Sequence, residues 1–313
     1  MALIMSDVHT FEVARPRLEA IAYRMLGSSA EAEDAVQETF LRWQAADTGR
    51  IEVPEAWLTK VLTNYCLNQL TSARARRETY VGQWLPEPLL AGDPMLGPAD
   101  TAEQRESVSY AVLVLLERLT PAERAVYVLR EAFGYPHREI AEILDISTAS
   151  SQQILHRARK HVAEGRARTE IDGAAARRIV EEFLAAATSG RTEPLIELLT
   201  QDAAAVGDGG GKVPARARAF EGAVAVATFL RGLFKPSDAK RALVGGSPAF
   251  YASTANGGPA LVAVVDGRVV AITCLEVTPG GIAAVRSQVN PDKLDRATER
   301  WAAEEHEAPL FVY

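Results

Sequence analysis

A cluster of glycine and proline residues between positions 82 and 98 divides this chain into dissimilar parts. Its members are Gly82, Pro86, Pro88, Gly92, Pro94, Gly97 and Pro98. Proline fixes φ and has no amide hydrogen, so such a stretch neither continues a helix nor enters the middle of a sheet. We therefore predict an extended linker over residues 81–104, with a separate helical block on each side of it.

The sequence on either side of this linker predicts a multidomain chain. Apolar residues recur at helical spacing in 1–80 and 105–168, whereas 169–313 begins with a helix and then passes into glycine-rich turns and β-branched runs. A length of 313 residues allows two or three domains. We expect two all-α domains followed by an α+β domain.

Within 169–313 we predict helices first and then a meander of strands. The expected helices span 172–188, 194–199 and 221–234, and the expected strands span 241–245, 248–253, 259–265, 268–276 and 282–289. Asp266-Gly267 and Pro279-Gly280-Gly281 are typical of the turns between strands.

The net charge of −7 argues, as an average, against a nucleic-acid-binding protein. The basic residues are clustered, however. Five lie between 157 and 168, where Glu164 is the one acid, while acids gather between 31 and 38. This distribution fits a chain that meets DNA on one side and a basic protein on another, and it also fits solvated helix faces.

The first block reads as a three-helix bundle. Ser28 followed by Glu31 has the spacing of a capping box and predicts a helix start. Pro54 suits the first turn of the next helix, which ends in the basic run 74–77. Basic residues at that end also complement the helix dipole, without any ligand.

The second block predicts a helix-turn-helix. A periodic helix over 108–119 is followed by Thr120-Pro121-Ala122-Glu123, an N-cap with proline at N1. A helix over 137–144, the turn Asp145-Ile146-Ser147 and a helix over 148–161 come next. The alternative is a purely structural helix pair.

In this interpretation the last helix is the recognition helix. Side chains suited to base edges are Ser150, Gln152 and Gln153, and side chains suited to phosphates are His156, Arg157, Arg159 and Lys160.

The composition indicates the cellular compartment in which this chain is expected. No apolar run approaches the ~20 residues of a membrane helix, and the N-terminus lacks the pattern of a secretory signal. Two cysteines, Cys66 and Cys274, exclude a disulfide scaffold and predict a reducing cytoplasm. We expect no metal and no cofactor.

Several segments resemble bacterial extracytoplasmic-function sigma factors. Residues 119–124, 140–144 and 155–160 resemble their promoter −35-binding domain, and 32–40 resembles their core-polymerase-binding helix. Trp57-Leu58, Asn64 and the 74–77 run resemble their −10 region. At Ser151 the family usually has an apolar core residue.

The resemblance implies a transcription initiation factor, not an enzyme, with core RNA polymerase (its β and β′ subunits) and promoter DNA as partners and no membrane. The implied core-polymerase-binding residues are Glu33, Asp34, Val36, Gln37 and Glu38. The implied −10 residues are Trp57, Lys60, Asn64, Arg74, Arg76 and Arg77.

The C-terminal part resembles the SnoaL-like, nuclear-transport-factor-like cone fold carried by a subgroup of these sigma factors. The resemblance implies an intramolecular regulatory domain that contacts the linker and the sigma domains. Its signature residues here are Trp84, Pro86 and Glu87 in the linker, Asp208, Gly209, Gly210, Gly211 and Lys212, and Asn290, Pro291, Asp292, Lys293 and Leu294.

Two other functions stay open at this stage. One is a ligand-responsive helix-turn-helix regulator that binds operators without polymerase. The other is a cone-fold, isomerase-like enzyme tethered to a DNA-binding domain, for which Asp208 and Tyr251 are the candidate acid–base groups. A small-molecule ligand in the cone is compatible with each of them.

Overall fold

The computed structural model describes residues 2–78, 80–97, 101–163, 173–215 and 218–313. The chain forms two compact units. The first combines Met1–Glu78 with Gly92–Arg166, and the second combines Thr79–Ala91 with Ala167–Tyr313. The predicted linker is thus shared between the units. In the described part of the chain, no helix has both the length and the apolar content to cross a membrane.

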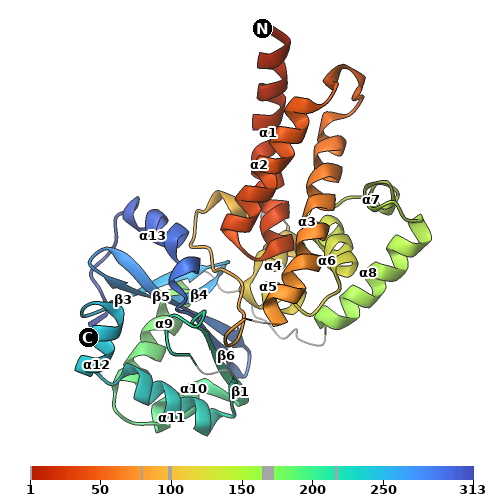
Figure 1. Ribbon diagram of the computed structural model, residues 1–313. Coiled ribbons are helices and arrows are strands. Elements are labelled where there is room, and N and C mark those ends of the chain that lie inside the picture. The colour runs from red at the N-terminus through yellow and green to blue at the C-terminus, as the bar shows by residue number, and fades with distance from the viewer. Residues whose placement is uncertain (1, 79, 98–100, 164–172, 216–217) are drawn as a thin grey trace. The chain divides into compact units, whose positions relative to one another are not determined.

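The first unit begins with three long helices, α1 (Ala2–Leu26), α2 (Ser29–Ala45) and α3 (Pro54–Glu78), which run side by side in Figure 1. The predicted helix start is confirmed, because Ser28 is the N-cap residue and its side chain accepts a hydrogen bond from the Glu31 amide. Gly27, with φ of 73°, makes the turn between α1 and α2. Phe11, Leu18 and Leu58 are among the side chains buried between the three helices.

The same unit continues through a 3₁₀ turn at Pro94–Leu96 and a series of short helices. These are α4 (Ala102–Val108), α5 (Tyr110–Leu116), α6 (Pro121–Tyr127), a π-helical turn (Val128–Ala132), α7 (His137–Leu144) and α8 (Thr148–Ala163). The cap at Thr120 is confirmed, because its hydroxyl accepts from the Glu123 amide at 3.3 Å.

The helix predicted over 108–119 is divided. Ser109 has an extended ψ of 141° and separates α4 from α5. Its hydroxyl and its amide both donate to the Glu106 carbonyl. A serine side chain can compete for backbone hydrogen-bond partners in this way and interrupt a helix. The spacing of apolar residues does not reveal such an interruption.

The second unit is α+β, as predicted. A seven-stranded sheet has the order β2-β1-β6-β5-β4-β3-β7, in which β1 is parallel to β6 and the other neighbours are antiparallel. The strands are β1 (Leu199–Asp208), β2 (Phe220–Glu221), β3 (Ala249–Ala255), β4 (Gly258–Val265), β5 (Arg268–Thr278), β6 (Gly281–Gln288) and β7 (Phe311–Val312).

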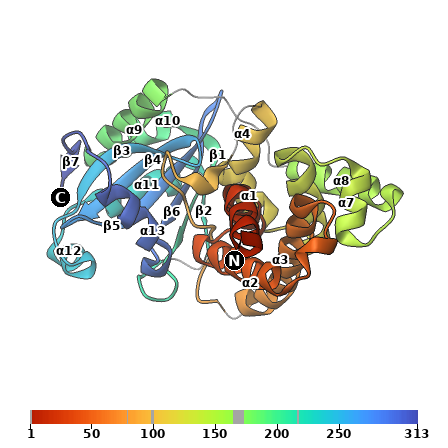
Figure 2. The same ribbon diagram turned by 90° about the horizontal axis from the view of Figure 1, so that it is seen from above.

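Helices cover one face of this sheet (Figure 2). They are α9 (Gly173–Thr188), α10 (Glu193–Leu198) and α11 (Ala223–Phe234), and α12 (Asp238–Val244) and α13 (Asp295–Ala302) complete the unit. Phe183 of α9 and Leu230 of α11 pack in one core with Phe250, Leu275 and Val285 from the strands. Burial of these side chains is the main stabilising contribution to the unit.

One predicted strand of this unit is wrong, and strand β1 was missed. The strand predicted at 241–245 is the end of α12, which Ser237 caps by accepting from the Lys240 amide and which Gly245 ends with φ of 83°. The first strand, β1, was not predicted at all. Its core positions are the small residues Ala203 and Ala205, so it lacks the β-branched pattern typical of strands.

Candidate nucleic-acid interface and linker-binding site

The helix-turn-helix of the first unit is built by local geometry. Asp145 ends α7 in the left-handed region, with φ of 59° and ψ of 44°. The Ser147 hydroxyl then caps α8 by accepting from the Ser150 amide at 3.0 Å. This reverses the chain within a few residues and lays α8 across α7.

The inner face of α8 consists of Ser151, Leu155, Ala158 and Val162, all buried. Ser151 is fully buried, and its hydroxyl shares a 2.9 Å hydrogen bond with His137 Nδ1 of α7. A polar pair thus replaces the apolar contact usual at this position. Burial lowers the pKa of His137 from its ordinary value, and Arg130 and Arg159 lower it further.

The outer face of α8 presents the residues predicted to meet DNA. Gln152, Gln153, His156, Arg157, Arg159 and Lys160 are all exposed. Ser150 differs, because it is half-buried and its hydroxyl lies 2.8 Å from that of Ser147. The structure therefore gathers six of the seven predicted side chains on one accessible face.

Two of these arginines are held by acids of the preceding helices. Arg157 Nε lies 3.4 Å from Glu123, and Arg159 donates to Glu131 at 2.9 Å. Burial acts to raise the pKa of Glu123, but hydrogen bonds from Thr120 and Arg157 outweigh it and the pKa lies below its ordinary value. The carboxylate thus stays charged and orients the basic face.

The predicted core-polymerase surface lies on α2. Glu33, Asp34 and Gln37 are exposed, and the half-buried Glu38 pairs with Arg42 at 2.9 Å. Val36 is only 1% exposed. Its side chain packs among the helices, so it supports this surface without being presented on it.

The predicted −10 residues lie along α3. Asn64 and Lys60 are exposed, while Trp57 is half-buried with its ring centroid 5.5 Å from that of Trp43. The side chains of Arg74, Arg76 and Arg77 lie outside the described residues.

Within the first unit, α3 also packs against the helix-turn-helix. Lys60 donates to the backbone carbonyl of Glu142 on α7 at 2.7 Å. Nearby, the Thr59 and Tyr135 hydroxyls share a buried 3.0 Å hydrogen bond. The two predicted DNA-binding elements are therefore in contact, and no pattern in the sequence indicates this pairing.

Two buried arginines connect α1 with α4 and α6 in the same unit. Arg24 of α1 donates to Ser107 and to the Leu96 carbonyl, and burial lowers its pKa to about 10. Arg124 of α6 donates to the Arg24 carbonyl at 3.1 Å and to Glu117 at 2.9 Å, and burial lowers its pKa to about 9. In the sequence both read as ordinary helix charges.

The second unit holds a separate polar cluster around Asp208, at the end of β1. This side chain is fully buried. Its oxygens accept from the Tyr80 hydroxyl at 2.6 Å, the Leu85 amide at 3.0 Å and Lys293 Nζ at 2.7 Å. We call Asp208, Gln288, Asn290 and Lys293 the linker clasp, because all four contact residues 80–86.

Lys293 is the centre of the clasp. Its ammonium donates to the Leu85 carbonyl at 2.7 Å as well as to Asp208, and it lies 3.1 Å from the centroid of the Trp84 ring. An ion pair beneath an aromatic ring and away from water is held far more firmly than one at the surface. Burial and the Asp208 bond raise the pKa of Tyr80.

The other members complete the contact with the linker. Asn290 donates to the Tyr80 hydroxyl at 2.9 Å, and Gln288 Nε2 lies 3.4 Å from the carbonyls of Leu85 and Pro86. The signature residues Pro86 and Glu87 are buried. Nearby, at the surface, Lys212 pairs with Asp292 at 2.6 Å.

The glycines of 209–211 permit this close packing. A Cβ on Gly210, where φ is +59°, would lie 2.4 Å from Asn290 Nδ2, and one on Gly209 would lie 2.0 Å from the Val213 carbonyl oxygen. The Gly210 amide also donates to Asp208 at 3.0 Å. The loop thus positions the clasp carboxylate.

A second contact with the linker was not predicted. Asn256, with φ of 51°, accepts from the Leu89 amide through its side chain and donates its own amide to the Leu89 carbonyl, both at 2.9 Å. The Ala91 amide donates to Thr254 at 3.1 Å. The only sequence signal was Asn256-Gly257, which reads as an ordinary hairpin turn.

The residues proposed for acid–base chemistry do not meet in a cavity. Asp208 faces the linker and is saturated with hydrogen bonds, while Tyr251 packs edge-on against Trp301 with ring centroids 4.9 Å apart. Neither is among the residues that line a cavity of about 470 Å³ in this unit. The arrangement therefore fits a structural clasp and contradicts a base at Asp208.

Comparison with known proteins matches both helical parts. Residues 10–76 match the family described as Sigma-70 region 2, and residues 109–162 match Sigma-70, region 4. The ECF RNA polymerase sigma factor SigJ of Mycobacterium tuberculosis is 38% identical over 297 residues, which cover 92% of this chain and 93% of SigJ.

A further relative and a solved structure agree over similar lengths. The probable ECF RNA polymerase sigma factor SigI of M. tuberculosis is 32% identical over 293 residues, covering 90% of this chain and 92% of SigI. The crystal structure of M. tuberculosis SigJ matches with a TM-score of 0.71 at 34% identity, covering 91% of this chain and 97% of the other.

Proposed function

Because this chain belongs to the extracytoplasmic-function sigma factors of RNA polymerase, we propose that its C-terminal domain regulates promoter-directed initiation in cis by holding the linker. Sigma factors bind core polymerase and promoter DNA. The observation that carries the proposal is the clasp, in which Asp208 and Lys293 together bind both backbone groups of Leu85. The protein would act in the cytoplasm, where promoters are.

The surfaces of the first unit supply the two partners. We assign the exposed face of α8 to the −35 element, with Gln152 and Gln153 reading bases and His156, Arg157, Arg159 and Lys160 contacting phosphates. We assign binding of the −10 element to Trp57, Lys60, Asn64 and the arginines of 74–77. Glu33, Asp34, Gln37 and Glu38 meet the basic β′ surface of polymerase, while the linker reaches toward β.

Regulation follows because the second unit and the polymerase compete for the linker. The stretch 80–91 is bonded to the second unit by the clasp and by Asn256. When the linker lies extended in a polymerase channel, the same backbone groups contact the polymerase instead of the second unit. The two states exclude one another, so the strength of the clasp sets the fraction of chain that is ready to join polymerase.

The test is transcription in vitro with the full chain and limiting core polymerase. Lys293→Met keeps the length of the stem but removes the bonds to Asp208 and Leu85. Trp84→Leu weakens the same contact from the linker side without altering the domain. We expect both variants to raise the yield of promoter-specific transcript several-fold.

Lys235→Met is the matched control, because that lysine is exposed and outside the clasp. Circular dichroism verifies that each variant is folded. Unchanged transcription in both clasp variants contradicts regulation through the linker, and a decrease in both shows that the clasp serves the holoenzyme instead of restraining the free chain. Absence of any transcript with wild-type chain on a promoter library contradicts the initiation activity itself.

A further inference from the structure

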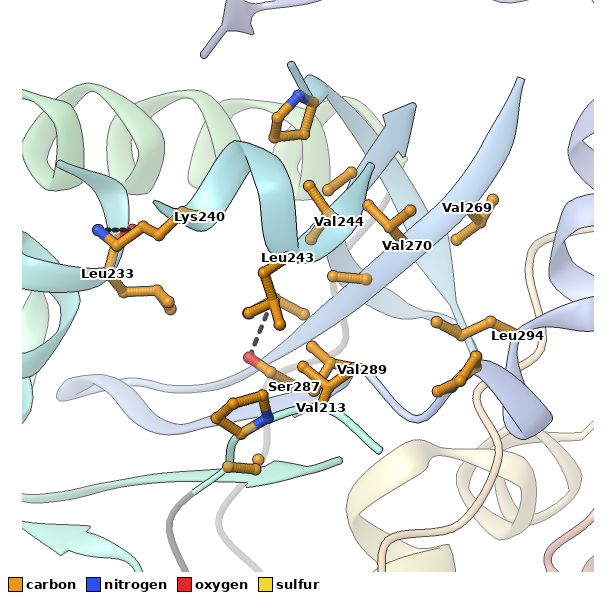
Figure 3. A pocket seen from close by; sticks show the side chains of 18 of the residues that line it. Val213, Leu233, Lys240, Leu243, Val244, Val269, Val270, Ser287, Val289 and Leu294 are labelled. Atoms are coloured by element: carbon orange, nitrogen blue, oxygen red, sulfur yellow. Dashed lines mark hydrogen bonds between the residues drawn. The ribbon is translucent and has the colours of Figure 1, made fainter. Parts of the chain in front are cut away.

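The second unit encloses a cavity of about 470 Å³ between the helix-covered face of the sheet and helices α11 and α12. Its volume lies within the range of sites that bury small organic ligands. Figure 3 shows Leu243 and Val244 of α12 pointing toward Val270 of β5 and Val289 beyond β6. The walls are thus mostly aliphatic, and Phe229 of α11 and Phe250 of β3 add aromatic surface.

A pair of hydroxyl groups lies in this apolar wall. The Thr273 and Ser287 hydroxyls share a 2.9 Å hydrogen bond across β5 and β6, drawn as a dashed line from Ser287 in Figure 3. Thr273 is 93% buried. Two hydroxyls carry two hydrogens, and their mutual bond uses one of them. The other is available to an acceptor oxygen in the cavity, where an unmet donor is costly.

The charged residues that line the cavity are mostly basic. Lys212, Arg218, Lys240 and Arg268 oppose the single carboxylate of Asp295 among the described lining residues. Lys240 is fixed by the carbonyls of Gly232, Leu233 and Lys235, and Lys212 is paired with Asp292. Arg218 is exposed and makes no hydrogen bond or ion pair with any described residue. A site with apolar walls and a cationic edge selects an apolar molecule that bears an anionic group.

The cavity and the linker clasp share the same strands. Gly207 of β1 pairs with Ser287 of β6, and both line the cavity. The next pair, Asp208 and Gln288, faces the opposite side of the sheet and holds the linker. Because successive strand residues point to opposite faces, a molecule in the cavity packs against the backbone that positions the clasp.

We propose that this cavity binds an apolar carboxylic acid, with its carboxylate at the basic edge and a second oxygen at the Thr273–Ser287 pair, and that binding strengthens the linker clasp. The occupied cavity restricts the ends of β1 and β6, so a ligand that fits the clasped state shifts the chain toward it. The coupling to transcription rests on the proposed function, whereas the binding site does not.

Binding is tested on the full chain with 8-anilinonaphthalene-1-sulfonate, an apolar anion whose fluorescence rises in dry sites. Ala271→Leu fills the cavity from β5, and Ala239→Leu adds the same bulk at an exposed position of α12 that does not line it. We expect saturable binding in the wild type and in Ala239→Leu, and loss of that binding in Ala271→Leu. Equal binding in all three overturns the site.

The chemistry of the ligand is tested by displacement of the probe. Decanoate should displace it more effectively than decanol or decyltrimethylammonium. A hydroxydecanoate that also carries an interior oxygen should bind more tightly than decanoate, and Thr273→Val should remove this difference. Arg218→Gln should weaken decanoate about two- to five-fold and leave decanol unchanged. If decanoate, decanol and decyltrimethylammonium displace the probe equally well, the assignment of the site to an anionic ligand is overturned.

The coupling is tested by amide hydrogen exchange of Leu85 and Leu89, whose amides donate to Asp208 and Asn256. We expect slower exchange with saturating decanoate in the wild type and no change in Ala271→Leu. Binding without this protection overturns the coupling and leaves the site. This measurement involves no polymerase, so its failure is distinguishable from failure of the proposed function, which the transcription of Lys293→Met reports.

Discussion

Thr59 and Tyr135 share a buried hydrogen bond of 3.0 Å between their hydroxyl groups, although 76 residues separate them. Thr59 lies on α3, the helix that carries the predicted −10 residues, and Tyr135 precedes α7 of the helix-turn-helix. Tyr135 follows the π-helical turn and lies two residues before His137. Together with the Lys60 bond to Glu142, this contact places the two predicted DNA-binding elements against one another.

The junction predicts an asymmetry between two threonines one helical turn apart. Thr59→Val leaves the Tyr135 hydroxyl buried without its partner, so we expect the free energy of unfolding of the first unit to fall by about 1–3 kcal/mol. Thr63 is equally buried, and its hydroxyl has no partner within the described residues. Thr63→Val should therefore be neutral or stabilising. Urea denaturation followed by circular dichroism measures both, and equal losses would show that the Tyr135 bond contributes nothing.

The exposed face of α8 predicts two kinds of effect on promoter binding. Gln152→Ala should reduce discrimination at a single base pair of the −35 element, by about 1–3 kcal/mol. Lys160→Ala should weaken binding evenly across sequences and reduce the slope of log affinity against log salt by about one. Holoenzyme binding to promoters selected from randomised DNA gives both quantities.

Arg191→Ala, at an exposed position of the second unit, serves as the control for removal of charge. It should alter neither the salt slope nor the base preference. If Lys160→Ala changes the preference at one base while Gln152→Ala changes only overall affinity, the assignment of reading and phosphate contacts along α8 is reversed.

His137 predicts a pH dependence of the helix-turn-helix. Burial, followed by Arg130 and Arg159, lowers the pKa of His137 from its ordinary 6.5. As the pH falls through 6.5, the unfolded chain is therefore protonated at His137 before the folded chain is. The contribution of neutral His137 to stability is present above pH 6.5 and is lost as the pH falls toward the lower pKa of the folded state. The urea concentration at the unfolding midpoint should decrease when the pH is lowered from about 7.5 to about 5.5, and the decrease should be smaller in His137→Gln. His156→Gln, altered at an exposed site, should follow the wild type.

Sequence patterns predicted what is locally encoded. The cap at Thr120, the left-handed turn at Asp145 and the buried spacing of α8 each depend on residues within a turn or two of one another. The hairpin at Asp266-Gly267 and the strands on either side of it were found for the same reason. Such features are visible because propensity and periodicity act over short distances.

The missed features depend on the tertiary fold. Arg24 and Arg124 look like surface charges until α1 and α6 bury them together. β1 is a strand because its parallel neighbour β6 and helix α11 accept its alanines, not because alanine favours strands. Val36 belongs to a motif that implied binding, yet a position on the inner side of α2 buries it. A single sequence shows which residues are unusual, and only the fold shows what surrounds them.

The clasp predicts a specific effect at Gly210. Alanine there adds a Cβ that would lie 2.4 Å from Asn290 Nδ2, in a backbone conformation with φ of +59°, so it displaces the side chain that holds Tyr80. Gly190→Ala is a matched control, because φ is +77° there but nothing lies within 4 Å of the added atom. Both variants carry the strain of the left-handed region, and only one disturbs the clasp. Limited proteolysis should cleave Gly210→Ala within 80–91 several-fold faster than Gly190→Ala, whereas equal rates would mean that Asn290 and Tyr80 do not restrain the linker.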